Sequence, residues 1–337
     1  MNILVVNLLR LGDIVISTPL FKALKAHFPK AEISVLVRKP GADICKCVPE
    51  IDRIFVYQNK FSLLRYIKDF KNQDCVIYLM ENKHLRLKFF SVLNIPRRVG
   101  YLLPNVKQKY LTDVVDWQGE FEGLEKLFLK VLEPLEIRNF VNTQPELTPR
   151  AEDLEKYEQI LPQNDFKIAI HIGSYAPSRR WPYFDRLIQL ILAKTTAYII
   201  LTGTEQDKIL GPDLAQISPQ RILDLRGKTG LRELPALFKM VDLVIGNDTG
   251  AVHIARAVNT KTIIIFGPED PRIIGDNSNT IKIYPDELAC KNANTFFDIP
   301  FPNVRRCRKW DCKQGDCLKK ISVERVWKQV KQVLEKE

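Results

Sequence analysis

With 337 residues, the chain is longer than one ordinary hydrophobic core can organise, and this length predicts two domains of about 150 residues each. Its apolar content of 45% and charged content of 27% are typical of a folded globular protein. No uncharged apolar run reaches the roughly 18 residues that a membrane-spanning helix needs. The apolar start is interrupted by Arg10 and Asp13 and has no small-residue cleavage site. It is therefore interpreted as a strand rather than a signal peptide, and the protein is predicted to be cytoplasmic.

The net charge of +11 is confined to one part of the chain. Residues 1–110 contain 19 Lys and Arg against 8 Asp and Glu, a difference of +11, whereas the other 227 residues contain 32 of each. This excess predicts an anionic partner for the first domain: phosphorylated lipid, acidic glycan, a membrane surface or nucleic acid. A merely solubilising basic surface has the same composition. No nucleic-acid-binding motif is present, and nucleic acid ranks last among these partners.

The beginning of the chain alternates strands with helices. A helix is expected from Ile14 or Ser17 to Phe28, and its short connections favour a parallel sheet. Ligands bind beyond the carboxyl ends of such strands, which places Gly12 and Asp13 at the mouth of the first domain. The strands are expected at residues 2–8, 33–37, 51–57 and 74–79.

Two basic segments accompany the last of these strands. Residues 60–71 predict a basic amphipathic helix, and residues 82–90 form another basic segment with Phe89 and Phe90 on its flank. Both have the composition of a surface that touches a membrane, and an ordinary solvated helix face has it as well.

The pattern restarts in the second half of the chain. Residues 117–135 have helical periodicity, and the polar stretch 138–150 is typical of an interdomain connection. Strands are then expected at residues 166–172, 198–201, 221–225, 241–245 and 262–266, and helices at residues 151–160, 181–194, 231–240 and 323–334. This alternation predicts an α/β protein of two similar, Rossmann-like doubly wound domains that face each other across a cleft, at residues 1–160 and 161–320.

The stretch Val244–Ala255 contains the clearest local motif. An apolar strand leads into a glycine-asparagine turn, after which Asp248 or Thr249 can cap a helix. Gly250 leaves backbone N–H groups accessible at the positive end of the helix dipole, which predicts an anion site. By itself the stretch also fits an ordinary strand-to-helix connection.

Several familiar motifs are missing from the sequence. No G-x-G-x-x-G occurs, which argues against a typical dinucleotide-dependent dehydrogenase. Gly227, Lys228 and Thr229 imitate the end of a P-loop, but Ile222 stands where that loop requires glycine. There is also no Asp-x-Asp pair to hold a divalent metal on a sugar diphosphate, so chemistry on such a ligand would use protein cations and helix dipoles.

Five short motifs follow one another along the chain: Leu11-Gly12-Asp13 with Ser17-Thr18-Pro19, Arg179-Arg180-Trp181-Pro182, Gly227-Lys228-Thr229 with Leu231 and Glu233-Leu234, Asn247-Asp248-Thr249-Gly250 with His253 and Ala255, and Phe266-Gly267-Pro268. In this order and spacing they resemble glycosyltransferase family 9, the ADP-heptose:lipopolysaccharide heptosyltransferases of Gram-negative bacteria. The resemblance covers most of the chain; only residues 60–160 lack recognisable motifs.

The resemblance implies a GT-B fold, with an acceptor-binding N-terminal domain and a nucleotide-sugar-binding C-terminal domain. A final helix, within residues 321–337, is expected to pack back across the domain junction. Transfer would be inverting, with no required cofactor or metal. Asp13, with Gly12 beside it on the acceptor side, would be the general base for the acceptor hydroxyl, a role that typically contributes ~100- to 10,000-fold. Alternatively, Asp13 merely caps the following helix.

The donor site implied by the resemblance lies in the second domain. Backbone N–H groups at Thr249, Gly250 and Ala251 would hold the diphosphate of ADP, together with a cation. The family has lysine at the position of Arg179; Arg180 is an equally basic neighbour, and the sequence leaves the choice open. The remaining candidates are Asp248 and His253 near the donor, Ser174 at another strand end, and Asp207, favoured over Glu205, on the ribose.

Four cysteines near the C-terminus, Cys290, Cys307, Cys312 and Cys317, invite a metal-site interpretation. They contain no C-x-x-C and do not have zinc-ribbon spacing, and members of the family often have cysteines in this region. Reduced thiols packed in a loop are the preferred interpretation, with no bound metal.

The predicted function is transfer of a heptose from ADP-heptose to the anionic inner core of lipopolysaccharide, by a cytoplasmic enzyme with peripheral contact at the inner face of the membrane as an open alternative. Another donor sugar, or a protein acceptor, would suit the same family. An epimerase of sugar nucleotides shares the fold but would need further carboxylates and histidines in the cleft. The chain has only four histidines, which makes this alternative less favoured. A sugar-nucleotide-binding protein without transferase activity is the alternative from another class.

Overall fold

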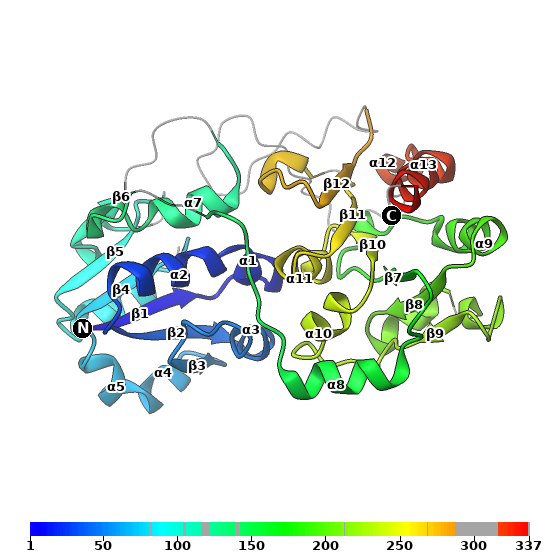
Figure 1. The fold of residues 1–337 in the computed structure, drawn as a ribbon. Helices are drawn as coiled ribbons and strands as arrows, with labels where there is room; N and C mark the ends of the chain where they lie inside the picture. Colours follow the sequence, from blue (N-terminus) through cyan, green and yellow to red (C-terminus); the bar gives the residue numbers. More distant parts are fainter. Residues whose placement is uncertain are drawn as a thin grey trace. The chain divides into compact units, whose positions relative to one another are not determined.

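A computed structural model describes residues 1–80, 83–103, 106–115, 121–138, 140, 142–211, 213–267, 269–286 and 316–335. The chain divides into two compact units, the first from Met1 to Thr148 and the second from Pro149 onward. The division falls before the boundary expected at residue 160, so helix α8 (Ala151–Ile160) begins the second unit (Figure 1).

The first unit is built on a six-stranded parallel sheet with the order β3-β2-β1-β4-β5-β6. Residues 3–6 in β1 have no exposed surface, because helices cover both faces of a parallel sheet. The strands are β1 (Asn2–Asn7), β2 (Glu32–Arg38), β3 (Arg53–Tyr57), β4 (Cys75–Tyr78), β5 (Arg97–Tyr101) and β6 (Asp113–Val115).

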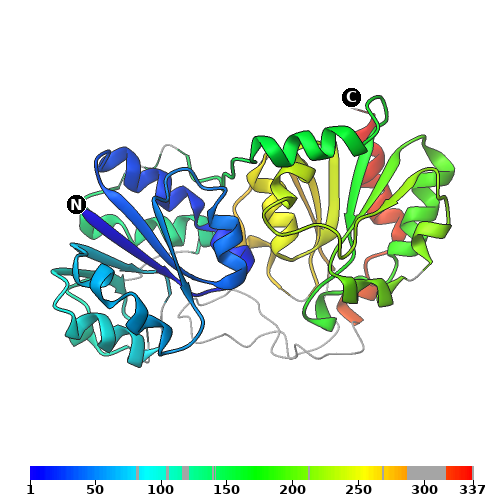
Figure 2. The ribbon, with the colours of Figure 1, turned by 90° about the horizontal axis from the view of Figure 1, so that it is seen from below.

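Helices lie on both faces of this sheet, as Figure 2 shows for the dark-blue helix α2 on one side and the light-blue and cyan helices on the other. On the second of these faces, Phe70 of α5 packs edge-on against Phe89 and Phe90 of α6. The helices are α1 (Leu11–Ile16), α2 (Thr18–His27), α3 (Lys39–Cys45), α4 (Ser62–Arg65), α5 (Ile67–Lys71), α6 (His84–Val92) and α7 (Leu124–Lys130).

The second unit repeats this plan with the order β12-β11-β10-β7-β8-β9, again all parallel. Its strands are β7 (Lys167–His171), β8 (Tyr198–Thr202), β9 (Ile222–Asp224), β10 (Leu243–Asn247), β11 (Lys261–Ile265) and β12 (Thr280–Ile283). Two doubly wound α/β units were expected, and this fold class is confirmed.

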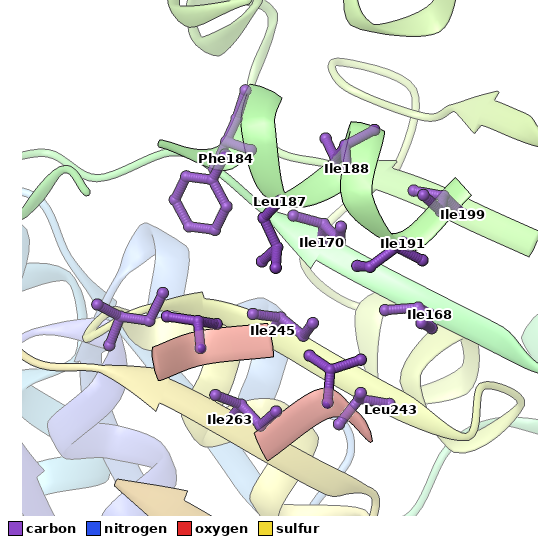
Figure 3. Close-up of a cluster of buried hydrophobic side chains, with 14 of the residues drawn as sticks. Ile168, Ile170, Phe184, Leu187, Ile188, Ile191, Ile199, Leu243, Ile245 and Ile263 are labelled. Carbon is purple, nitrogen blue, oxygen red and sulfur yellow. The ribbon is translucent and has the colours of Figure 1, made fainter. Parts of the chain in front are cut away.

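The core of the second unit forms where α9 (Phe184–Lys194) covers the sheet. Phe184, Leu187, Ile188 and Ile191 recur at helical spacing and pack on strand residues such as Ile170 (Figure 3). The final helix, α13 (Val323–Leu334), contributes Val326, Val330 and Val333 to the same core and contacts α9. The other helices are α10 (Leu234–Lys239), α11 (Gly250–Ala257) and α12 (Asp316–Lys319).

Candidate active site

The site is built on two neighbouring strands from which the chain leaves in opposite directions. β7 continues to β8 and β9 on one side of the sheet, whereas its neighbour β10 continues to β11 and β12 on the other. A crevice that binds ligands opens at such a switch point, beyond the carboxyl ends of the strands. The loop after β7 contains Ser174, Arg179 and Arg180, and the turn after β10 contains Asp248 and Thr249, so the structure brings the two predicted donor segments to one edge.

Asn247, the last residue of β10, ties these two segments together. Its side chain is fully buried. Its Oδ1 accepts a hydrogen bond from the Trp181 backbone N–H at 2.9 Å, and its Nδ2 donates to the Ile172 carbonyl at 3.0 Å. An amide is needed here because the position requires one acceptor and one donor. From the sequence, Asn247 was expected in a turn and in the motif that it begins, with no role in joining the two segments.

Replacing Asn247 by alanine is expected to lower the free energy of unfolding by about 2 kcal/mol, because the Trp181 N–H and the Ile172 carbonyl lose their buried partner. Asn247→Asp should destabilise the protein as well, since a carboxylate cannot donate to the carbonyl. Urea denaturation measures both changes. A fully stable alanine variant would contradict this bracing role.

Arg179 lies between two buried carboxylates. Its guanidinium nitrogens are 3.1 Å from Asp248 Oδ2 and 3.1 Å from Glu269 Oε1, and the exposed fractions of the two carboxylate side chains are 7% and 3%. Glu269 follows β11 and was missed, because no local pattern connects it with Arg179 so far away along the chain. The charge of Arg179 is therefore already compensated by carboxylates of the protein before any diphosphate arrives.

Arg180 has a different set of contacts. Its Nε donates to the Ser174 carbonyl at 2.8 Å, and its side chain is half-buried. This bond braces the loop that follows β7, in which Ser174 is itself buried. The contacts thus distinguish the two arginines, with Arg179 paired to carboxylates and Arg180 bound to backbone, while their roles toward a diphosphate stay predictions.

The start of α11 contains two buried polar atoms without a hydrogen-bond partner among the described residues, Thr249 Oγ1 and His253 Nδ1. Thr249 is the N-cap residue, yet its side chain makes no capping bond. The other ring nitrogen of His253, Nε2, lies 3.4 Å from Asp248 Oδ1. Since buried polar atoms are nearly always paired in folded proteins, orphaned atoms beside a helix N-terminus indicate a place where a ligand completes the hydrogen bonding.

The close approach of α11 to the sheet depends on Gly246. A Cβ atom there would lie 2.9 Å from Val252 Cγ1 of the helix and 3.1 Å from the His171 carbonyl oxygen. The glycine lets the first turn of α11 lie directly over the strand ends, so that the N-terminus of this helix faces the predicted donor site.

Asp207 is buried beneath the neighbouring turns. Its Oδ2 accepts hydrogen bonds from the backbone N–H and the hydroxyl of Thr204, both at 2.7 Å. A Cβ atom at Gly173 would be 2.3 Å from the same oxygen, so this glycine is required for the packing. The carboxylate supports the loops after β7 and β8, and its predicted contact with the ribose stays a prediction. Glu205, the alternative, has an exposed side chain paired with Lys208.

His171 ends β7 beside these loops. Its Nδ1 is 3.1 Å from Thr202 Oγ1, and burial lowers the pKa of the imidazole from 6.5 to about 4. The ring is neutral at pH 7, which suits a hydrogen-bonding role between strand ends and not a charged contact with phosphate.

In the first unit, the corresponding switch point lies between β1 and β4. Asp13 follows β1 in the first turn of α1, and its Oδ2 accepts a hydrogen bond from the Arg10 backbone N–H at 3.1 Å. The capping role weighed for Asp13 is thus present, and Gly12 and Asp13 lie at the expected strand end. Buried Asn7 secures this segment by donating to Ser17 Oγ at 2.9 Å.

Two arginines at the same edge of the sheet, Arg38 and Arg86, were not among the residues predicted from the sequence. Arg38, the last residue of β2, and Arg86 of α6 place their guanidinium carbons 5.7 Å and 5.2 Å from the ring centroid of Tyr57, the last residue of β3. Arg38 Nε also donates to the Leu8 carbonyl at 3.1 Å. This arginine-tyrosine cluster (Arg38, Tyr57, Arg86) concentrates positive charge at the carboxyl ends of β2 and β3, beside the loop that follows β1.

Among the described residues, no cluster of three or more His, Cys, Asp or Glu is arranged to hold a metal ion. Cys290, Cys307 and Cys312 lie outside the described residues, and Cys317 of α12 is buried. None of the helices in the described ranges is long and apolar enough to cross a bilayer.

The model of glycosyltransferase family 9 (heptosyltransferase) matches residues 97–295. Lipooligosaccharide heptosyltransferase 2 of Haemophilus influenzae is 25% identical over 317 residues, covering 86% of this chain and 90% of the relative. Lipopolysaccharide heptosyltransferase 3 of Escherichia coli K12 is 27% identical over 280 residues, covering 77% and 80%.

Solved structures share the fold. ADP-heptose lipopolysaccharide heptosyltransferase II of Escherichia coli superimposes with a TM-score of 0.76 at 18% identity, over 100% of this chain and 99% of the other. A family 9 glycosyl transferase of Veillonella parvula gives 0.79 at 17% identity, over 100% and 97%. A heptosyltransferase of Escherichia coli with ADP-2-deoxy-2-fluoro heptose gives 0.71 at 16% identity, over 98% and 99%. The fold class is therefore GT-B, and because the family model matches more than half of its residues, this chain belongs to glycosyltransferase family 9 and is a glycosyltransferase.

Proposed function

We propose that this glycosyltransferase moves a heptose from ADP-heptose to the inner core of lipopolysaccharide, with inversion and without a metal cofactor. One observation carries the proposal: two buried polar atoms without a hydrogen-bond partner among the described residues, Thr249 Oγ1 and His253 Nδ1, lie at the start of α11, at the switch point of the second sheet. The relatives named above, heptosyltransferases of lipopolysaccharide and lipooligosaccharide, support this acceptor, and the structural relative named as an ADP-heptose lipopolysaccharide heptosyltransferase supports this donor.

In the proposed reaction, Asp13 takes the proton of the acceptor hydroxyl as its oxygen attacks the anomeric carbon. A new C–O bond forms on one face of the sugar while the bond to the β-phosphate oxygen of ADP breaks on the other, which inverts the configuration. A carboxylate suits this step because the hydroxyl becomes acidic only as the bond forms. The proton stays on Asp13 until solvent removes it.

The departing ADP needs positive potential at its β-phosphate. The N–H groups of Gly250 and Ala251 at the start of α11 would supply it, with Thr249 Oγ1 and His253 Nδ1 as further hydrogen-bonding groups. Arg179 would contribute by exchanging part of its contact with Asp248 and Glu269 for the diphosphate, and Arg180 and Ser174 by shaping the loop.

The acceptor would bind through the first unit, beside Gly12 and Asp13. The arginine-tyrosine cluster lies at the same edge of the sheet and suits an acceptor that carries carboxylates or phosphates, because guanidinium groups bind such oxygens in a fork geometry. The excess of basic residues in this part of the chain supports an anionic acceptor. We propose a cytoplasmic location at the inner face of the membrane, where such an acceptor would be available.

Incubation with ADP-heptose and defined inner-core acceptors, followed by mass spectrometry, tests the proposal. The expected product is the acceptor enlarged by one heptose, with release of ADP and undiminished yield in the presence of a chelator. ADP binding without any product would instead indicate a binding protein without transferase activity. A product formed only with another sugar donor, or only on a protein hydroxyl, would keep the family and overturn the substrate assignment.

A further inference from the structure

Exposed apolar side chains of the first unit gather on two helical segments. Phe61, directly before α4, and Leu64 within it are 67% and 55% exposed, and Leu85 and Val92 on α6 are 61% and 68% exposed. These four are the described apolar side chains of this unit that are more than half exposed. Large apolar groups gathered on an outer surface mark a site of contact with another apolar phase.

Each segment exposes a stripe of side chains. On α6, Leu85, Lys88 and Val92 recur at helical spacing and are all exposed. In the first segment, the exposed residues are Phe61 before α4, Leu64 within α4 and Lys68 in the following helix α5. The opposite sides of the same helices are buried, for example at Leu63 and Phe70.

The two stripes belong to one face of the sheet. Phe70 of α5 contacts Phe89 and Phe90 of α6, which places α5 and α6 side by side, and α4 directly precedes α5 beside β3 (Figure 1). We call this outer surface the α4–α6 face and define it by the exposed residues Phe61, Leu64, Arg65, Lys68, Leu85, Lys88 and Val92.

The charges of this face have one sign. The segments 60–71 and 83–92 contain seven Lys and Arg and a single acidic residue, Asp69, which is engaged with Arg53 at 2.6 Å. Lys60 extends its ammonium to 5.0 Å from the Phe61 ring centroid. Apolar side chains surrounded by cations match the headgroup region of an anionic bilayer, where rings and aliphatic groups enter the acyl boundary and ammonium groups bind lipid phosphates.

We propose that the α4–α6 face docks the enzyme on an anionic membrane surface. This proposal rests on the proposed function and extends it, because it assigns the contact with lipid to particular residues of the unit proposed to bind the acceptor. Docking of this kind depends on exposed apolar groups and charge, so it can be tested without donor or acceptor.

Sedimentation with phosphatidylcholine vesicles, with and without about 30% phosphatidylglycerol, tests the proposal on the full chain. The wild type should bind the anionic vesicles, lose binding at high salt, and bind neutral vesicles at least tenfold more weakly. The variants Phe61→Ser/Leu64→Ser and Arg65→Glu/Lys68→Glu should each weaken binding about tenfold or more.

Matched controls lie in the second unit. Ile209→Ser removes an apolar side chain that is 81% exposed, and Lys194→Glu/Lys328→Glu makes the same change in net charge at exposed positions. Both control variants should bind vesicles like the wild type. Unchanged ADP affinity in every variant would show that the proteins are folded.

Equal loss of binding in the control and test variants would overturn the proposal, since it would reduce the effect to net charge. So would a wild type that does not sediment with anionic vesicles. Light scattering measures the oligomeric state as a further test. If Phe61→Ser/Leu64→Ser converts a dimer to a monomer while vesicle binding persists, the face joins two copies of the chain and does not dock on lipid. Vesicle binding is measured without transfer, so absence of transferase activity does not affect these outcomes. Failure of the membrane proposal can therefore be told apart from failure of the proposed function.

Discussion

Replacing Asp13 by asparagine is expected to lower kcat by about 100- to 10,000-fold, while ADP binds as tightly as before. Asparagine cannot take the proton of the acceptor hydroxyl. Its amide oxygen can still accept the hydrogen bond from the Arg10 backbone N–H, so the cap of α1 is kept and the fold should be undisturbed. Single-turnover rates with ADP-heptose and calorimetric titration with ADP separate the chemical step from donor binding.

Asp43→Asn is the matched control, because Asp43 is another carboxylate of the first unit, exposed and paired with Lys46. It should leave both rate and affinity unchanged. Full activity of Asp13→Asn would reduce Asp13 to a helix cap. A large loss of melting temperature together with activity would mean that capping, and not proton transfer, explains the effect.

Removing the guanidinium in Arg179→Ala is expected to have two effects. The free energy of unfolding should fall by about 3 to 5 kcal/mol, because two buried carboxylates, Asp248 and Glu269, lose the cation between them. ADP binding should weaken by about 1 to 3 kcal/mol, the range for a lost charge-assisted hydrogen bond. Chemical denaturation measures the first effect and calorimetric titration the second.

A second substitution separates these two effects. In Arg179→Ala/Glu269→Gln one of the two stranded carboxylates becomes a neutral amide, so stability should return in part while the loss of ADP affinity persists. If the affinity returned as well, Arg179 would act only by neutralising Glu269. Arg180→Ala should then carry the larger affinity loss and identify Arg180 as the cation for the diphosphate.

Periodicity and capping were enough to predict most of the longer elements of this chain, although residues 60–71, expected as one helix, form the two short helices α4 and α5. The helix expected at residues 323–334 is α13 (Val323–Leu334), and it begins where Ser322 Oγ accepts the Arg325 backbone N–H at 3.2 Å. The helix expected at 151–160 is likewise α8. Apolar residues at helical spacing or in continuous short runs determine these elements locally, so the doubly wound fold class followed from their alternation.

Three strands that were missed are short and depend on their neighbours. β5 (Arg97–Tyr101) begins with two arginines, β6 (Asp113–Val115) has three residues, and β12 (Thr280–Ile283) contains Lys282. None has the apolar run of an isolated strand signal. β6 and β12 are edge strands, and all three are held by backbone pairing with a neighbouring strand already in place.

For the candidate site too, one part was predictable from the sequence and another part was not. The sequence by itself determined which turns follow which strands, and therefore that Gly12 and Asp13, Ser174, and Asp248 to Gly250 lie at the carboxyl ends of parallel strands. Only the tertiary structure decided which side chains meet there. Asn247 binds Trp181 across 66 residues, and Arg179 is enclosed by Asp248 and Glu269. Such contacts leave no local pattern, because the order of strands in the sheet creates them and the free energy of burying charge requires each one to find a partner.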